Sequence, residues 1–432
     1  MTAVCVRPAG GAAAPASGSV RLVGQHFAAA TLYLLAGSLG LCWIAPELAA
    51  GAWLSPHVAG VTHLFTLGWL TTTIFGALTQ LLPAALGLPL RSRGAAEATF
   101  WSFAPGVGLL AAGVATSRLG LLVPGVLLLA TGVVIALVNL AATLIRAPHR
   151  DVTWTAIALS LAFLASTLGL GLTLAHNLHT GFIAAARVRV LAIHLHVALV
   201  GWVLLMIVGV SHRLLPMFLM AQGADTRWTG RSVGALAAGV VVLGAGIWAS
   251  RPLLEWGGAL LLAAGLGCFL RQAWAFYRAR IRRQLDPGLR YAATALFFLA
   301  AAAGLGIAVL ATGASEARLA TAYVTTGLLG GIVLYVMGFF YKIVPHLAWR
   351  ARFSGRLRRE PAPAVTQMYS PRLALVQLGV MAAGVVVIAG GIGASSAAGA
   401  RAGAVLFLVG LLLFLVWLIR VVSGRPVLPV GS

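Results

Sequence analysis

Acidic residues are scarce in this chain: 8 Asp and Glu occur among 432 residues, against 30 Lys and Arg. Charged residues of both signs make up 9% of the sequence, whereas soluble domains carry about 25%. A water-soluble fold of this size could not cover its surface with so few charges. Hydrophobic residues make up 60%, and the mean hydropathy is +0.99. The composition therefore predicts a polytopic membrane protein and excludes soluble enzyme folds.

Cysteine is equally rare, and this excludes a disulfide framework. Cys5, Cys42 and Cys268 are scattered and form no CxxC pair, so we interpret them as small apolar residues. The net charge of +22 would suggest a nucleic-acid partner in a soluble protein. Here the basic residues lie between apolar runs, so we expect no nucleic-acid partner. They indicate membrane topology and contacts with anionic lipid instead.

Twelve apolar runs are each long enough to cross the hydrocarbon core as a helix, which needs about 20 residues. They are too long, and do not alternate, for the strands of a β-barrel. We therefore predict an all-α membrane protein with twelve transmembrane helices in one domain over 23–425. Residues 1–22 are predicted to be a disordered cytoplasmic tail, and 426–432 a second cytoplasmic tail. The predicted spans are 26–47, 57–83, 97–116, 119–145, 152–177, 189–217, 230–250, 253–276, 290–313, 319–345, 371–394 and 402–423.

Basic residues are distributed unevenly over the connections between these runs. If the N-terminus lies inside, 24 of the 30 fall on the inner side, including the clusters Arg278–Arg283 and Arg350–Arg359. The positive-inside rule then predicts that both termini are cytoplasmic. We expect a multi-pass protein of the cytoplasmic (inner) membrane, whose basic residues contact the lipid bilayer and its anionic lipids.

One motif recurs in the even-numbered spans. His63 is followed by Gly68-Trp69, then by Gly76 and Pro83. His196 begins the same pattern with identical spacing: Gly201-Trp202, Gly209 and Pro216. The tenth span keeps the frame without the histidine: Thr325, Gly330, Gly338 and Pro345. The offsets of 133 and 129 residues predict three four-helix repeats around a pseudo-threefold axis, with the second, sixth and tenth spans at the centre. The predicted repeats are 23–150, 151–285 and 286–425.

Three histidines lie about two turns inside the outer boundary: His63, His194 and His196. A polar ring in hydrocarbon is costly without a partner, and every Asp and Glu lies at a span end or in a loop. A metal or haem iron is a natural partner of neutral imidazole; a backbone carbonyl or a Ser/Thr hydroxyl is the alternative. The pattern favours ligation. His57, at the outer mouth of the second span, is a fourth candidate.

The remaining histidines are predicted to be interfacial, because they lie near span ends or in loops: His26, His149, His176, His179, His212 and His346. His194 and His196 are about 200° apart on a helix, so they cannot bind one iron together. Their rings must therefore face two different spaces between helices.

The sixth span carries, in order, His194-Leu195-His196, Gly201-Trp202, Gly209 and Pro216. This stretch resembles the His-x-His helix of haem-copper oxidase subunit I, most of all in the C-type oxidases. The resemblance implies twelve helices in three arcs, with two haems bound from opposite faces of that helix. It also implies that the low-spin haem takes its second ligand from the second helix, where His63 lies. The chain is also similar to the NnrS family of haem- and copper-containing membrane proteins linked to nitric oxide stress.

The chain departs from the oxidase pattern in three ways. The His-x-His helix belongs to the third repeat in the oxidases and to the second repeat here. Residues 230–250 contain no histidine that could bind copper. The acidic residues of the proton path are also missing. The resemblance therefore implies one or two haem b groups, with copper as a further metal of the family, but no complete copper centre or proton path. It points to electron transfer, or to nitric oxide, haem or copper handling, beside other membrane redox subunits. As an enzyme, the chain would be a haem-dependent oxidoreductase. The alternatives are a cofactor-free transporter or channel, or a structural subunit of a membrane complex.

Two pairings of the histidines are open. Repeat symmetry places His63 and His194 on either side of the space between the second and sixth spans. It turns His196 towards the third repeat, where Tyr323 and Tyr335 are the nearest polar candidates. Analogy with the oxidases pairs His63 with His196 instead.

Overall fold

The computed structural model describes residues 18–87, 89–221, 223, 225–281, 283–312, 317–353 and 364–424. Regular structure in these residues is entirely helical. Twelve helical spans among them are long and apolar enough to cross a membrane. The predicted all-α class with twelve spans is therefore confirmed.

Nine of the described spans are single α-helices: α1 (Gly18–Ala49), α4 (Arg93–Thr116), α5 (Leu119–Ile145), α6 (Val152–Thr180), α9 (Arg227–Ala249), α10 (Pro252–Arg278), α11 (Pro287–Thr312), α14 (Pro371–Gly393) and α15 (Ala397–Ser423). Short 3₁₀ turns η2 (Ala184–Ala186) and η5 (Val365–Gln367) lie in the connections. The second, sixth and tenth spans are built differently, because each contains a π-helix between two α-helices. They are α2 (Pro56–His63), η1 (Leu64–Thr71) and α3 (Thr72–Leu86); α7 (Arg187–His196), η3 (Val197–Leu204) and α8 (Leu205–Leu219); and α12 (Ala317–Thr325), η4 (Thr326–Val333) and α13 (Leu334–Phe353).

The N-terminal boundary differs from the prediction. Residues 1–17 and 425–432 lie outside the described residues, but α1 begins at Gly18, within the segment 1–22 that we expected to be disordered. Polar residues around Arg21 and His26 interrupt the apolar run and hide the start of the helix from a hydropathy reading. Arg21 is exposed, whereas His26 is buried.

The expectation that His26 is interfacial is therefore wrong. Its ring is 2% exposed and packs 4.8 Å from the Phe100 ring, and its Nδ1–H donates to the Leu22 carbonyl oxygen over 2.9 Å. The helix continues past the polar residues and packs against Gly76 of α3. A Cβ atom on Gly76 would lie 2.5 Å from the His26 Cβ, so the glycine leaves the room that His26 occupies.

The π-helices lie in the same register of their three spans. They begin at Leu64, Val197 and Thr326, 133 and 129 residues apart. In η1 the Thr71 hydroxyl donates to the Thr66 carbonyl over 2.9 Å, five residues earlier, as the wider π turn allows. π-Helical segments inside α-helices occur frequently at functional sites.

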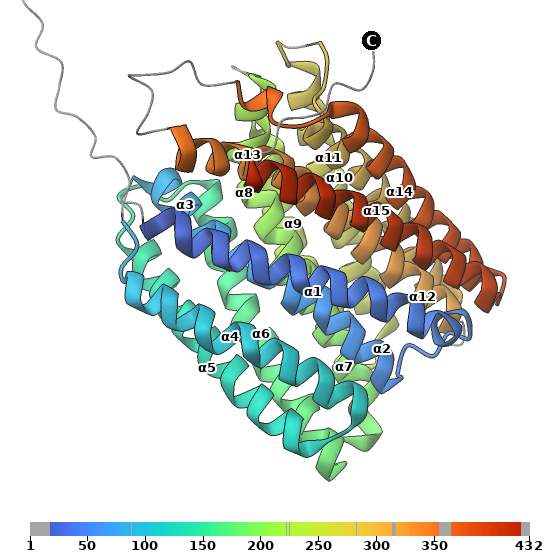
Figure 1. The fold of residues 1–432 in the computed structure, drawn as a ribbon. Helices are drawn as coiled ribbons and strands as arrows, with labels where there is room; N and C mark the ends of the chain where they lie inside the picture. Colours follow the sequence, from blue (N-terminus) through green and yellow to red (C-terminus); the bar gives the residue numbers. More distant parts are fainter. Residues whose placement is uncertain are drawn as a thin grey trace, which may run out of the picture.

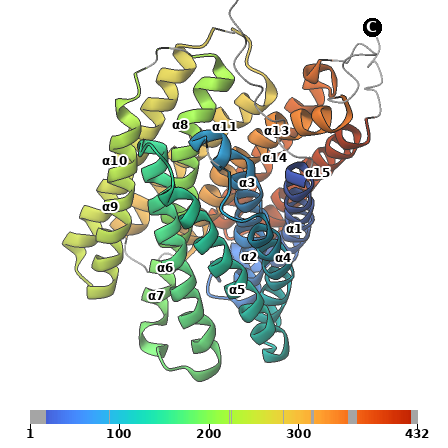
Figure 2. The same cartoon turned by 90° about the vertical axis from the view of Figure 1, so that its left-hand side faces the viewer.

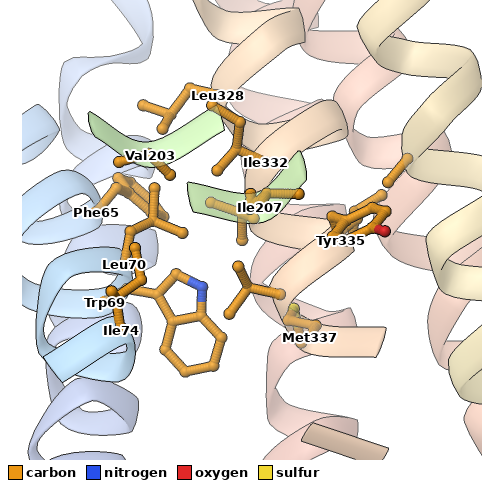
Figure 3. Close-up of a cluster of buried hydrophobic side chains, with 14 of the residues drawn as sticks. Phe65, Trp69, Leu70, Ile74, Val203, Ile207, Leu328, Ile332, Tyr335 and Met337 are labelled. Atoms are coloured by element: carbon orange, nitrogen blue, oxygen red, sulfur yellow. The ribbon is translucent and has the colours of Figure 1, made fainter. Parts of the chain in front are cut away.

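These three spans pack together at the centre of the bundle. η3 contacts both η1 and η4. Figure 3 shows their apolar side chains in one cluster, with Phe65 and Leu70 from η1, Val203 from η3 and Ile332 from η4. α2, α7 and α12 lie towards one end of the molecule, and α3, α8 and α13 lie towards the other (Figures 1 and 2).

The remaining spans include three tight hairpins, α4–α5, α9–α10 and α14–α15. Each turns at a serine with a left-handed backbone: Ser117, Ser250 and Ser395, at φ of 54°, 52° and 55°. Beside each turn a glycine permits close backbone contact. A Cβ on Gly113, Gly246 or Gly391 would lie 2.5, 2.6 or 2.3 Å from a backbone nitrogen of the next helix. Small residues let helix backbones approach closely within a membrane.

Candidate functional site

The candidate histidines lie at one structural position, where an α-helix gives way to a π-helix. His63 is the last residue of α2 and His196 the last residue of α7. Thr325 ends α12 in the same way. All three precede the π-helices on the end of the molecule formed by α2, α7 and α12. The rings of His63, His194 and His196 are all half-buried.

His63 and His196 are held by the same hydrogen bond. The Nδ1–H of His63 donates to the Ala59 carbonyl oxygen over 2.7 Å, and that of His196 donates to the Ala192 carbonyl oxygen over 2.9 Å. Because a carbonyl oxygen can only accept, Nδ1 carries the proton and Nε2 of the neutral ring keeps its lone pair. Metal-ligating histidines are oriented in this manner, with the second nitrogen bonded to a carbonyl or carboxylate.

His194 has no such bond. Its Nδ1 is buried and makes no well-formed hydrogen bond among the described residues, although the Thr167 backbone is close enough to interact with the ring. The backbone of Thr167 on α6 lies beside the ring. Gly171, also on α6, borders the ring edge: a Cβ atom added to this glycine would lie 3.4 Å from Cε1 of His194. The ring lies within electrostatic range of His63. An unpartnered polar atom in such a place costs about 1–3 kcal/mol, so this ring is suited to an additional partner.

His196 faces the third of these spans. Its Nε2 lies 3.4 Å from the Tyr323 hydroxyl, and the two rings stack with their centroids 6.2 Å apart and their planes at 28°. Tyr323 stands 129 residues after His194 and so occupies the corresponding position of the tenth span. His196 thus lies against Tyr323 of the tenth span, as repeat symmetry predicts, and His194 lies within electrostatic range of His63. The pairing of His63 stays a prediction.

His57 is not brought together with these residues. Its Nδ1 lies 2.8 Å from a carboxylate oxygen of Glu47, and its ring lies 4.6 Å from the Trp43 ring. The side chain is 43% exposed. His57 therefore has its own ion-pair partner at the mouth of the second span.

Within the described part of the chain, no group of three or more His, Cys, Asp or Glu side chains is placed to hold a metal ion. Of the three histidines, His196 contacts Tyr323 of the neighbouring tenth span, and His194 lies within electrostatic range of His63 of the second.

Three neighbours of the site were missed from the sequence. Gly171 and Thr167 of α6 flank the His194 ring, but glycine is frequent in every span and gave no separate signal. Thr71 was also missed: its hydroxyl accepts a hydrogen bond from the Trp202 indole over 3.1 Å and so joins the second and sixth spans just below the histidines.

No protein-family model matches the chain, and no curated protein matches it in sequence. Its fold does match a solved structure. A heme-copper terminal oxidase dimer, determined by cryo-electron microscopy, superimposes with a TM-score of 0.72 and 13% identity, covering 96% of this chain and 86% of that one. The chain thus has a haem-copper oxidase subunit I-like fold. At this identity the likeness shows the fold alone.

Proposed function

We propose that this chain is a membrane haem protein in which His63 and His194 would hold one haem b. The observation that carries the proposal is a second buried histidine, His194, which lies within electrostatic range of His63 and whose Nδ1 makes no well-formed hydrogen bond among the described residues. His63 supports it with a free Nε2 fixed by the bond from Nδ1 to Ala59. The oxidase-like fold makes a haem between these two spans a natural expectation.

The residues around the pair fit a haem in chemical terms. His63 is held in one tautomer, and Gly171 leaves room beside the His194 ring. No carboxylate competes for either ring among the described hydrogen bonds. When held by these two imidazoles, a haem would supply single-electron transfer. The protein's part is to orient both rings and to keep water from the site.

His196 and Tyr323 already contact each other, with 3.4 Å between His196 Nε2 and the Tyr323 hydroxyl. We therefore propose one haem, held by His63 and His194, and give His196 a packing role against Tyr323.

The function we propose is electron transfer within the cytoplasmic membrane, between membrane redox subunits. The excess of basic residues on one side supports cytoplasmic termini and contacts of that face with anionic lipid. The common register of the π-helices, together with a serine turn in one hairpin of each predicted repeat, supports three four-helix repeats within one membrane domain.

The decisive experiment is spectroscopic. The full chain is purified in mild detergent with haem supplied during expression, and its absorption is recorded before and after dithionite. We expect a Soret band that shifts on reduction, a low-spin signal in electron paramagnetic resonance, and one haem b per chain by the pyridine haemochromogen assay. A folded, colourless protein that takes up no added haem would overturn the proposal and favour a cofactor-free transporter, channel or structural subunit.

A further inference from the structure

A large cavity lies at the end of the molecule opposite the histidines. Its volume is about 1260 Å³, which exceeds the roughly 300–1,000 Å³ of ordinary small-molecule pockets. The diverging helices α3, α8 and α13 form its walls, and the start of α1 closes one side. Ile74, Ile207 and Tyr335 of the central cluster in Figure 3 line its inner end. None of the three candidate ligands lines it.

The walls of this cavity are largely apolar. Phe27, Met206, Phe218 and Phe340 are typical of the side chains that line it. Polar atoms on the wall are partly satisfied within the protein; the Ser211 and Tyr335 hydroxyls, for example, bond to each other over 2.7 Å. Ordered water needs two to four polar partners, so such walls favour hydrocarbon over water as the filling.

The lining also carries positive charge. Arg93, Lys342 and Arg350 line the cavity, with Glu97 as the single carboxylate among its lining residues. Lys342 is paired with Asp286. Neither Arg93 nor Arg350 has an ion-pair partner within the described part of the chain. The cavity thus combines an apolar interior with two uncommitted guanidinium groups, on the side that the arginine distribution predicts to be cytoplasmic.

We propose that this cavity binds an acidic membrane phospholipid, with an acyl chain of the lipid in the apolar interior and its anionic headgroup at Arg93 and Arg350. Charge complementarity selects the anionic headgroup, because guanidinium groups bind phosphate with paired hydrogen bonds. The apolar walls select the acyl chain. The lipid would occupy the space between the diverging ends of the three central spans and hold them together. This proposal is independent of the haem site.

The test is native mass spectrometry of the full-length protein in detergent, delipidated and then titrated with phosphatidylglycerol or phosphatidylcholine. We expect the wild-type protein to retain one phosphatidylglycerol in preference to phosphatidylcholine. Arg93→Gln with Arg350→Gln should weaken phosphatidylglycerol binding on the order of tenfold or more, with phosphatidylcholine binding unchanged.

Cavity-filling variants test the location. Ala77→Trp and Val210→Phe each place a larger side chain in the cavity wall. Both should lose the retained lipid, whereas Ala112→Trp, at an exposed position of α4, should keep it. If either filled variant is folded by size-exclusion chromatography and still retains phosphatidylglycerol as the wild type does, the proposal is wrong. Retention of phosphatidylcholine equal to that of phosphatidylglycerol, or of a neutral isoprenoid quinone in its place, would also overturn it.

Discussion

His196 Nε2 lies 3.4 Å from the Tyr323 hydroxyl, across the space between the sixth and tenth spans. Tyr323 holds in the tenth span the position that His194 holds in the sixth. The corresponding positions of the second and sixth spans are occupied by His63 and His194, so a histidine pair stands there in place of a histidine and a tyrosine. At the interface between the sixth and tenth spans, the phenol of Tyr323 takes the place of a second imidazole and contacts His196 directly.

This difference leads to a prediction for single histidine substitutions. His63→Ala and His194→Ala should each abolish the low-spin haem signal, because each removes one axial ligand. His196→Ala should keep the signal, and so should His57→Ala, which serves as the control because His57 pairs with Glu47. Absorption and electron paramagnetic resonance spectra of the four purified variants measure the outcome. Loss of the signal in His196→Ala together with its retention in His194→Ala would favour the oxidase-like pairing. Full haem in the three variants at 63, 194 and 196 would remove haem from these positions.

Close packing of the π-helices predicts sensitivity to an added methyl group. A Cβ on Gly201 would lie 2.6 Å from Cγ of Phe163, so Gly201→Ala should destabilise the protein by about 1–3 kcal/mol. Gly169 of α6 has no neighbouring atom within 4 Å of an added Cβ. Gly169→Ala should therefore be neutral or stabilising by up to about 1 kcal/mol. Thermal unfolding in detergent compares the two; equal melting temperatures would contradict the packing described here.

The positive-inside distribution predicts the orientation of the chain. Reporter fusions after residues 50 and 317 should read as external, and a fusion after residue 360 should read as internal. Alkaline phosphatase and fluorescent-protein fusions report the two sides with opposite signals and so serve as mutual controls. An external signal at residue 360 would overturn the predicted topology.

Asp151 predicts a pH dependence of stability at the start of α6. Burial raises the pKa of this carboxyl. A hydrogen bond from the Trp154 N–H at 2.8 Å and the paired Arg213 together lower the pKa by more than burial raises it, so the net pKa lies below its usual value. A lowered pKa in the folded state stabilises the protein above the unfolded pKa of about 3.9. This stabilisation is lost as the pH falls through the folded value.

Asp151→Asn should accordingly lower the melting temperature at pH 7, and the difference from wild type should shrink as the pH falls below the unfolded pKa of about 3.9 and through the lower folded pKa. Asp151→Ala also removes the cap of α6 and should cost about 1 kcal/mol more. The control is Asp225→Asn, because Asp225 pairs with Arg227 at the exposed surface, where ion pairs contribute little. A difference for Asp151→Asn that is the same at pH 7 and pH 3 would contradict this account.

Much of the architecture could be predicted from the sequence, because crossing a bilayer imposes a length and a composition on each helix. The spans over 119–145 and 371–394 were located to within a residue of α5 and α14. The glycine, proline and histidine register indicated which three spans share one construction. Hydropathy failed at residues 18–26, where polar side chains interrupt the apolar run although the helix continues.

Sequence by itself determined the membrane class, the number of spans and the three histidines that are costly to bury, since each follows from local composition and helical period. Only the tertiary structure decided which space His196 faces, that His26 is buried, that the three central spans contain π-helices, and that their other ends diverge around a cavity. These features depend on contacts between residues far apart in the sequence, such as His26 and Phe100 or His196 and Tyr323. A helical pattern fixes the face on which a side chain lies, but the neighbour on that face is fixed only when the helices pack.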